Sequence, residues 1–295
     1  MFSLRVHSGH RGSGTVCRLL AAWVTRENAD ILDEAFKAFT DACASDPHLE
    51  RVTGGAATCH CDGWGYAAVL ERDSGVHVVY ERFYAPDHEE HKTSLVAATR
   101  RLMSLVREYR SVTILLHCRK AGRTEPLGVA HAHPYREELT YYELFLAHNG
   151  SFHKDDLALL TGRPPQLYTD SALAAKLYAR FLESGGEALD AMRRLSFYTR
   201  TAFNVVAVLV ERSNGRPSII YSALTCSEDP ARLDYYEAYI YAAHDMFLYA
   251  SSTVAQNLEK QGVALNWERV RGANGYIGYY EKGQHIRQPI GCPKR

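Results

Sequence analysis

The chain has 295 residues, and its 34 basic and 34 acidic side chains cancel to a formal net charge of zero. No segment collects a long run of like charges, so neither nucleic acid nor an anionic membrane surface is an expected partner. At this length a folded chain buries about 75% of the surface that it exposes when unfolded, which provides a sizeable core. A small neutral or zwitterionic substrate fits this charge balance best.

The cysteines and the apolar runs indicate the compartment. Seven cysteines are an odd number, and residues 1–16 carry Arg5, Arg11 and glycines in place of an apolar secretory core. The longest aliphatic run, residues 205–210, is far shorter than the ~20 residues that cross a bilayer. We therefore expect a soluble cytoplasmic protein with reduced thiols.

The start of the chain differs in composition from the rest. Residues 1–15 are rich in Ser, Gly, His and Arg and have no hydrophobic periodicity, which is typical of disorder or of a removable leader. A misplaced start is the third interpretation, because a GTG codon read as Val16 can initiate translation. We expect residues 1–16 to be absent or disordered in the working protein, and residues 17–295 to form a single domain.

Three segments have the periodicity of amphipathic helices. Apolar side chains recur on one helical face over residues 29–44 and again over residues 94–109. A third helix is predicted from the capping oxygens at residues 169–171 to the stop at Gly185-Gly186.

Short segments rich in Val, Ile, Tyr and Phe lie between these helices and predict strands. They cover residues 66–70, 76–80, 112–117, 143–148, 203–211, 218–222, 246–250, 264–270 and 276–280. The turn sequences at 73–75 and 213–215 fit hairpins. Because the strands come in adjacent pairs rather than in strict alternation with helices, antiparallel sheets covered by helices are favoured over a doubly wound fold.

One distant pair of motifs suggests a reaction. Cys17 stands just ahead of an apolar, strand-like stretch, and Asn149-Gly150 follows another such strand. A thiolate and an oxyanion-binding pocket are what amide-bond chemistry needs. The alternatives are a buried, inert Cys17 and a simple Asn-Gly turn.

Six motifs occur in order along the chain. They are Cys17-Arg18-Leu19-Leu20, Asp62-Gly63-Trp64-Gly65-Tyr66, Leu116-His117-Cys118-Arg119-Lys120-Ala121-Gly122, His131-Ala132-His133-Pro134-Tyr135, His148-Asn149-Gly150-Ser151 and Thr169-Asp170-Ser171. This succession resembles the class II glutamine amidotransferases, whose glutaminase domain is an N-terminal nucleophile (Ntn) hydrolase, and within them the stand-alone, single-domain branch. The resemblance covers nearly everything from Cys17 to about Tyr280. It implies an α+β fold, a four-layer α/β/β/α sandwich of two antiparallel sheets covered by helices.

The resemblance also implies that Cys17 is the first residue of the mature chain. A free α-amine has a pKa of about 7.7 to 8.0 and can act as a general base, whereas an amide nitrogen cannot accept a proton. The thiolate then forms a thioester that water hydrolyses, and ammonia is the first product.

The resemblance also implies roles for four other residues that match the family motifs. Asn149 and Gly150 match the oxyanion hole, Arg119 matches the clamp for the substrate α-carboxylate, and Asp170 matches the acid that takes the α-ammonium group. In isolation, Arg119 also fits a surface position at a strand end and Asp170 fits a helix cap.

Three further residues are assigned to the substrate-binding region. Gly63 and Trp64 are expected to shape the wall near the nucleophile. His133 and Pro134 are expected to form a structural turn near the substrate-binding loop. The chain departs from the common family pattern at Gly122, His131 and Ala172.

The sequence thus predicts glutaminase-type hydrolysis that needs no cofactor and no metal. The ammonia serves an acceptor, with a separate synthase as the expected partner, or the chain is an amidase for a larger γ-glutamyl conjugate. The Tyr-rich segment at residues 235–241 fits an acceptor surface or ordinary packing.

Two other classes of protein are weighed against this one. Soft ligands cluster at residues 59–62, 117–118 and 131–133, which suggests a zinc protein. The Cys-x-Cys spacing argues against it, because structural zinc sites use Cys-x2-4-Cys pairs. A non-catalytic regulatory subunit is the other alternative if residues 1–16 are retained, because the amine is then blocked.

Overall fold

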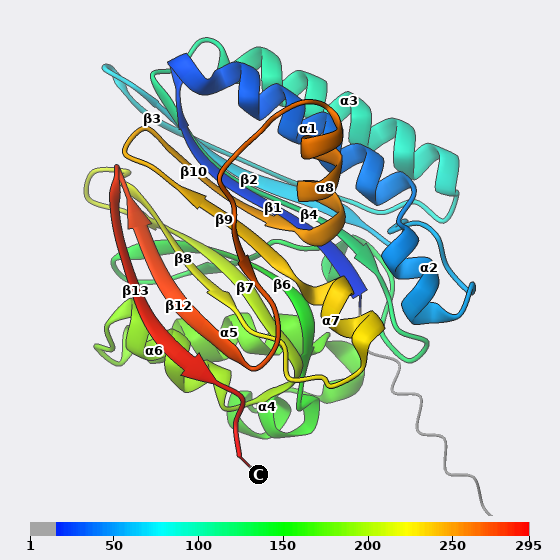
Figure 1. The fold of residues 1–295 in the computed structure, drawn as a ribbon. Helices are drawn as coiled ribbons and strands as arrows, with labels where there is room; N and C mark the ends of the chain where they lie inside the picture. The colour runs from blue at the N-terminus through cyan, green and yellow to red at the C-terminus, as the bar shows by residue number, and fades with distance from the viewer. Residues whose placement is uncertain (1–15, 295) are drawn as a thin grey trace, which may run out of the picture.

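The computed structural model describes residues 16–294 and consists of four layers. Two antiparallel sheets pack face to face, and helices cover the outer face of each sheet (Figure 1). This α/β/β/α arrangement confirms the predicted α+β sandwich. No helix within residues 16–294 is both long and apolar enough to cross a membrane.

The first sheet contains the strand that begins at Val16. Its order is β11-β9-β10-β1-β4-β2-β3, and β1 pairs with β10 on one side and with β4 on the other. The bounds are β1 (Val16–Thr25), β2 (Trp64–Arg72), β3 (Gly75–Phe83), β4 (Ser111–Lys120), β9 (Ala238–Ala242), β10 (Met246–Ser251) and β11 (Glu268–Val270).

The second sheet has the order β13-β12-β8-β7-β6-β5. Its bounds are β5 (Tyr135–Glu138), β6 (Tyr142–Phe152), β7 (Thr199–Glu211), β8 (Pro217–Ala223), β12 (Asn274–Glu281) and β13 (Gln284–Gly291). A bulge between Gly150 and Phe152 interrupts the pairing of β6 with β7.

Three groups of helices surround the sheets. Helices α1 (Ala29–Ala44), α3 (His88–Val106) and α8 (Ser252–Lys260) cover the first sheet, and α4 (Lys154–Thr161), α5 (Asp170–Glu183) and α6 (Ala188–Ser196) cover the second (Figure 1). The short helices α2 (Pro47–Thr53) and α7 (Pro230–Tyr236) lie near the start of β1. In the described part of the chain, the remaining elements are the 3-10 turns η1 (Arg26–Asn28), η2 (Val129–His131) and η3 (Pro165–Leu167).

Strand alternation decides which side chains enter the space between the sheets. In β1, Leu19 and Ala21 belong to the core between the sheets, whereas Leu20 and Ala22 belong to the core under the helices. Because side chains of a strand alternate, Cys17 faces the second sheet and Arg18 faces the helices. The two residues therefore have different environments although they are adjacent.

Most predicted elements are confirmed. The helix over 29–44 and the helix after Thr169 are present, and the predicted hairpins form β2–β3 and β7–β8. The helix predicted over 94–109 instead covers His88–Val106, since Asp87 caps it through the Glu90 N–H. The strand predicted over 264–270 is wrong for its first half, because only Glu268–Val270 finds a pairing partner in β9.

The expectation of reduced thiols is not met in the structure. Cys226 and Cys292 form a disulfide, as do Cys59 and Cys61, and Cys17, Cys43 and Cys118 are free. Cys226 follows β8 and Cys292 follows β13, so the pair is brought together by strands that both flank β12. A separation of 66 residues along the chain hides this proximity from the sequence.

Candidate active site

The start of β1 meets the inner face of the second sheet at Cys17. Cys17 lies opposite Arg119 of β4 in the register of the sheet, and its backbone N–H donates to Asn149 Oδ1 of β6 at 3.2 Å. All three residues are buried. Phe145 and Ala147 of β6 face the space between the sheets, so Asn149, two residues further on, faces it as well. The structure thus brings together three residues that are far apart in the sequence.

The thiol of Cys17 is shielded in this form of the chain. Burial raises its pKa to about 12, although the Arg119 charge and a backbone hydrogen bond from Lys120 act in the opposite direction. A thiol with this pKa is protonated at neutral pH and is a poor nucleophile. With Val16 attached, Cys17 also has an amide nitrogen in place of an amine.

Gly150 occupies a position that only glycine fits. Its φ is +155°, and a Cβ at this position would lie 2.1 Å from the Ala202 carbonyl oxygen and 2.7 Å from His148 Nε2. His148 is itself held between Ser171 Oγ at 3.0 Å and the Ala202 oxygen at 3.1 Å. The backbone of Gly150 is therefore fixed beside Asn149 by close packing.

Arg119 is a buried arginine with unused donors, so the surface alternative for this residue is wrong. Its Nη1 donates to the Pro126 carbonyl at 2.9 Å, whereas Nε and Nη2 have no hydrogen-bond partner among the described residues. No carboxylate of residues 16–294 forms an ion pair with it. Two adjacent free donors of a guanidinium match the two oxygens of a carboxylate.

Asp170 is buried at the start of α5, close enough to Cys17 for its charge to raise the pKa of the thiol. It is not the helix cap, since Thr169 Oγ1 accepts the Ala172 N–H at 3.0 Å. Asp170 instead accepts from the Phe152 N–H at 2.8 Å and from the Ser171 N–H at 2.7 Å. Burial raises the pKa of Asp170, and these two hydrogen bonds oppose that rise.

Gly63 and His133 lie close to these residues. The Arg119 N–H donates to the Gly63 carbonyl at 2.8 Å, and Gly63 has a φ of +127° that favours glycine. His133 is buried with both ring nitrogens unpartnered, and burial holds its pKa well below the usual value, with His117 and Arg119 adding to this effect. A cis peptide bond joins it to Pro134.

Trp64 is not brought to the site, which corrects its assignment to the wall near the nucleophile. It packs in the core under the helices, stacked on Phe83, and its Nε1–H donates to Ser94 Oγ. The reason is alternation again, because Trp64 lies opposite Cys118 in the sheet, on the face away from Arg119.

A cavity of about 1120 Å³ opens directly above the buried residues. Val16, Lys120 and Ser151 line it, and each is the chain neighbour of Cys17, Arg119 or Gly150. The buried site residues themselves do not line the cavity. Val16, the residue before Cys17, is thus part of the cavity wall.

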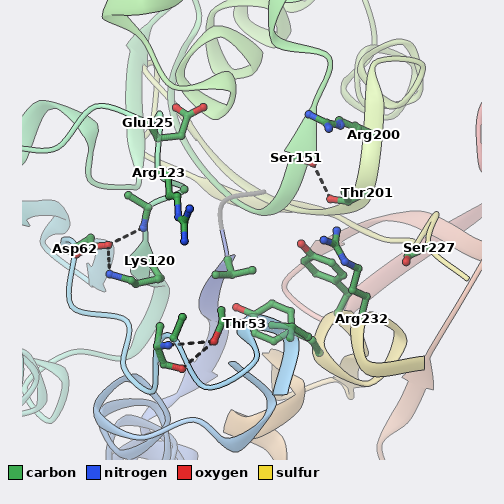
Figure 2. A pocket seen from close by; sticks show the side chains of 18 of the residues that line it. Thr53, Asp62, Lys120, Arg123, Glu125, Ser151, Arg200, Thr201, Ser227 and Arg232 are labelled. Atoms are coloured by element: carbon green, nitrogen blue, oxygen red, sulfur yellow. Dashed lines mark hydrogen bonds and ion pairs between the residues drawn. The ribbon is translucent and has the colours of Figure 1, made fainter. Parts of the chain in front are cut away.

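The wall of the cavity is rich in charge. Asp62 Oδ2 accepts from Lys120 Nζ at 2.7 Å and from the Ala121 N–H at 2.9 Å, which secures the end of β4 (Figure 2). Figure 2 shows Arg123 on one side of the cavity and Arg200 on the other. Both arginines are exposed, and neither forms an ion pair with the chain from Val16 to Lys294.

Several residues that hold this site were given no role on the basis of the sequence. Tyr235, in the Tyr-rich segment, is buried and donates to the Cys17 carbonyl at 2.8 Å. Glu125 lines the cavity and pairs with Lys154 at 3.1 Å. Only the abundance of tyrosine pointed toward Tyr235, and no local signal marked Glu125.

The positions of the potential metal ligands give little support to a zinc site. Within residues 16–294, the only three potential ligands whose donor atoms lie within 4.8 Å of each other are Cys59, Cys61 and His88. The two sulfurs of this group are bonded to each other. His117 and His133 stack with ring centroids 3.9 Å apart but do not join that group.

Comparison with protein families identifies the family of this chain. The model of the family described as "Glutamine amidotransferases class-II" matches residues 29–196, which is more than half of the 295 residues. The protein is therefore an enzyme of the amidotransferase class. It belongs to the class II glutamine amidotransferases, as its motifs predicted. The match includes Arg119, Asn149 and Asp170 and begins after Cys17.

Comparison with solved structures finds a protein from Pseudomonas aeruginosa PA01 described as a predicted glutamine amidotransferase. The two chains are 16% identical, with a TM-score of 0.38, and the alignment covers 93% of this chain and 98% of that one. Comparison with curated proteins gives no match.

Proposed function

We propose that this enzyme is an Ntn-type glutaminase in which Cys17, as the first residue of the working chain, attacks the side-chain amide of glutamine or of a γ-glutamyl compound. The observation that carries the proposal is the meeting of Cys17, Asn149 and the unpaired Arg119 in one buried space. Family membership supports the same chemistry.

The reaction assigns a task to each group. The α-amine of Cys17 takes the thiol proton, and the sulfur adds to the amide carbon. Asn149 Nδ2 and the Gly150 N–H stabilise the oxyanion. The amine then gives the proton to the leaving nitrogen, which departs as ammonia. Water, deprotonated by the same amine, hydrolyses the thioester and releases the acid.

Arg119 and Asp170 recognise the amino-acid end of the substrate in this proposal. A bidentate contact from Nε and Nη2 of Arg119 to the α-carboxylate satisfies the two donors that the chain leaves unpaired. Asp170 accepts two backbone hydrogen bonds and one from Ser171 Oγ, which leaves about one of the four lone-pair sites of a carboxylate for the α-ammonium group.

Removal of Val16 does two things in this proposal. It frees the amine of Cys17, and it joins the buried space around the thiol to the cavity that Val16 lines. Entry of water and substrate removes much of the burial that raises the thiol pKa.

The test compares two forms of the protein in an ammonia-release assay with glutamine. One form begins at Cys17 and the other retains Val16, and mass spectrometry verifies each terminus. We expect activity only in the first form and none in its Cys17→Ala variant. Equal activity of the intact Val16 form, or activity of Cys17→Ala, contradicts the proposal.

A larger γ-glutamyl conjugate is the second candidate substrate, and the cavity favours it. Its volume of about 1120 Å³ lies slightly above the range of about 300–1,000 Å³ that is typical of sites for drug-sized ligands, and it exceeds what free glutamine fills. The unpaired Arg123 and Arg200 on opposite walls suit an anionic group on the leaving amine.

Substrate comparison separates the two candidates. For a conjugate with an anionic amine portion, we expect a kcat/KM above that for glutamine and a several-fold loss in Arg200→Ala. The same variant leaves glutamine hydrolysis unchanged. The conjugate candidate is wrong if glutamine has the higher kcat/KM and Arg200→Ala leaves the kcat/KM of both substrates unchanged. Ammonia transfer to a separate synthase then remains the proposed use of the site.

A further inference from the structure

A buried charge cluster lies behind the nucleophile, on the helix side of β1. Arg18 Nε is 2.7 Å from Asp46 Oδ2, and His60 Nε2 is 2.7 Å from the same oxygen. All three side chains are fully buried. The cluster adjoins Cys17 through Arg18 in the chain and through His60 in space.

Every position around the Asp46 carboxylate is used. Its second oxygen accepts from Thr253 Oγ1 at 2.8 Å and from the His48 N–H at 3.0 Å. Burial alone would raise the pKa of Asp46, but the Arg18 charge and the His60 hydrogen bond bring it well below its usual value. Asp46 is therefore ionised and can only accept.

An ionised Asp46 fixes the tautomer of His60. Burial holds the pKa of His60 below its usual value, although Asp46 opposes this effect. A neutral imidazole has one N–H, and the contact with Asp46 requires that N–H at Nε2. The lone pair of His60 therefore stands at Nδ1.

The lone pair at Nδ1 faces the bond that precedes Cys17. His60 Nδ1 lies 3.3 Å from the Val16 carbonyl oxygen. In the neutral Nε2–H tautomer neither atom brings a proton to this contact, whereas a protonated ring would donate to the carbonyl. In a chain that begins at Cys17 this carbonyl is absent. The Cys17 nitrogen lies about 2.3 Å from that oxygen in the intact peptide unit, and with the oxygen gone it is free to approach Nδ1. A lone pair opposite an amine is a complementary arrangement.

We propose that His60, oriented by Asp46, positions the α-amine of Cys17 by accepting one of its hydrogens at Nδ1, so that the amine lone pair points at Sγ. A neutral amine has two N–H groups and one lone pair. Asn149 Oδ1 accepts one N–H, as it already does from the Cys17 backbone at 3.2 Å, and His60 accepts the other. The only direction left for the lone pair is toward the thiol proton. His60 and Asp46 are positioning residues in this scheme, which rests on the proposed function.

The proton balance is closed within this group. The thiol proton moves to the amine, and the resulting ammonium keeps its hydrogen bonds to Asn149 and His60. The thiolate attacks, and the ammonium returns the proton to the leaving nitrogen. His60 holds its Nε2 proton throughout, because Asp46 remains its partner.

The test uses protein that begins at Cys17, and it measures the thiol without any substrate. The rate of Cys17 alkylation by iodoacetamide is followed against pH, with the site verified by mass spectrometry. In His60→Ala we expect a rate about tenfold lower at pH 7, since one hydrogen bond to the ammonium is lost. The rise of the profile moves to higher pH by about one unit. His60→Asn, which retains an acceptor near the position of Nδ1, restores part of the rate.

Other charged and titratable groups near His60 also influence the pH dependence of alkylation. The charged and titratable side chains that face it or act on it are Asp46, Arg18, Tyr235, His91 and His117. The control is His285→Ala, which removes a histidine hydrogen-bonded to Tyr221 at the far end of the sandwich. We expect this variant to leave the alkylation profile unchanged. An unchanged profile in a folded His60→Ala protein overturns the proposal.

A second measurement does not depend on the variants. Nitrogen-15 shifts of the His60 ring in the protein that begins at Cys17 report the tautomer directly, and we expect the proton on Nε2. A proton on Nδ1 overturns the proposal. Glutamine hydrolysis is assayed in parallel. A shifted alkylation profile in a protein without glutaminase activity supports the positioning of the amine and contradicts the proposed function alone.

Discussion

Two fully buried arginines on neighbouring strands of the first sheet have opposite surroundings. Arg18 on β1 lies against Asp46 and over the Tyr235 ring, 4.1 Å from its centroid. In both arginines Nε and Nη2 lack a partner with hydrogen-bond geometry among the described residues. Arg18 nevertheless has the Asp46 carboxylate as counter-ion, whereas Arg119 on β4 has only the Pro126 carbonyl. A buried charge without a counter-ion is costly unless something else completes its environment. The contrast suggests that Arg18 serves the fold and that Arg119 is left open for a ligand.

The largest expected effect is the loss of folding stability when Arg18 is replaced. Arg18→Met leaves the Asp46 carboxylate buried without its main counter-ion, and breaking a buried pair costs about 3–5 kcal/mol. We expect the free energy of unfolding, from urea titration, to fall by that amount. A loss below about 1 kcal/mol would mean that the pair contributes little.

Acid titration examines the same pair without changing the size of a side chain. The folded-state pKa of Asp46 lies below its unfolded value of about 3.9. The stability from this group is therefore complete above pH ~3.9 and is lost as pH falls toward the folded pKa. We expect a slope of about 1.4 kcal/mol per pH unit from this group below pH ~3.9. The slope should flatten in Arg18→Met, and an identical slope in both proteins would assign it to other groups.

Arg119→Lys isolates the proposed clamp. An ammonium cannot make the two parallel hydrogen bonds of a guanidinium. We expect the KM for glutamine to rise by roughly tenfold while kcat falls less, because ground-state binding is lost. Steady-state kinetics of the form that begins at Cys17 provide the measurement. Unchanged kinetics would contradict the clamp.

The smallest effect is expected from Arg119→Met on stability. This substitution removes a buried charge that has no counter-ion in the chain, so nothing is left unpaired except the Pro126 carbonyl. We expect the free energy of unfolding to change by less than about 1 kcal/mol. A loss as large as that of Arg18→Met would make the two arginines equivalent and would remove the contrast.

The sequence predicted those parts of the molecule that local patterns determine. The helix Ala29–Ala44 follows from its apolar stripe, and the hairpins follow from their turn residues. Arg119 and Asn149 were found through a resemblance of motifs, and their positions next to Cys17 come from strand pairing that no local pattern contains. Their functions are still proposals.

The misplaced and missing residues have physical reasons. Trp64 was assigned to the site by its place beside Gly63, but one step along a strand turns a side chain to the opposite face. Arg18 stood in the motif around Cys17 but was given no role, and Asp46 had no signal, because a buried ion pair between a strand and a distant loop leaves no periodicity. His60 was noticed only as a possible metal ligand among cysteines.

The Cys226–Cys292 disulfide has a practical consequence for handling the enzyme. The bond closes a long segment of chain, with a sequence separation of 66, and such a cross-link stabilises a fold by about 4 kcal/mol in the chain-entropy model. Thiol reductants added to keep the proposed nucleophile Cys17 reduced also undergo exchange with disulfides. Reduction of this bond would release the cross-link after the last strand, so the reductant concentration in storage and assay buffers has to be chosen with both cysteine sites in mind.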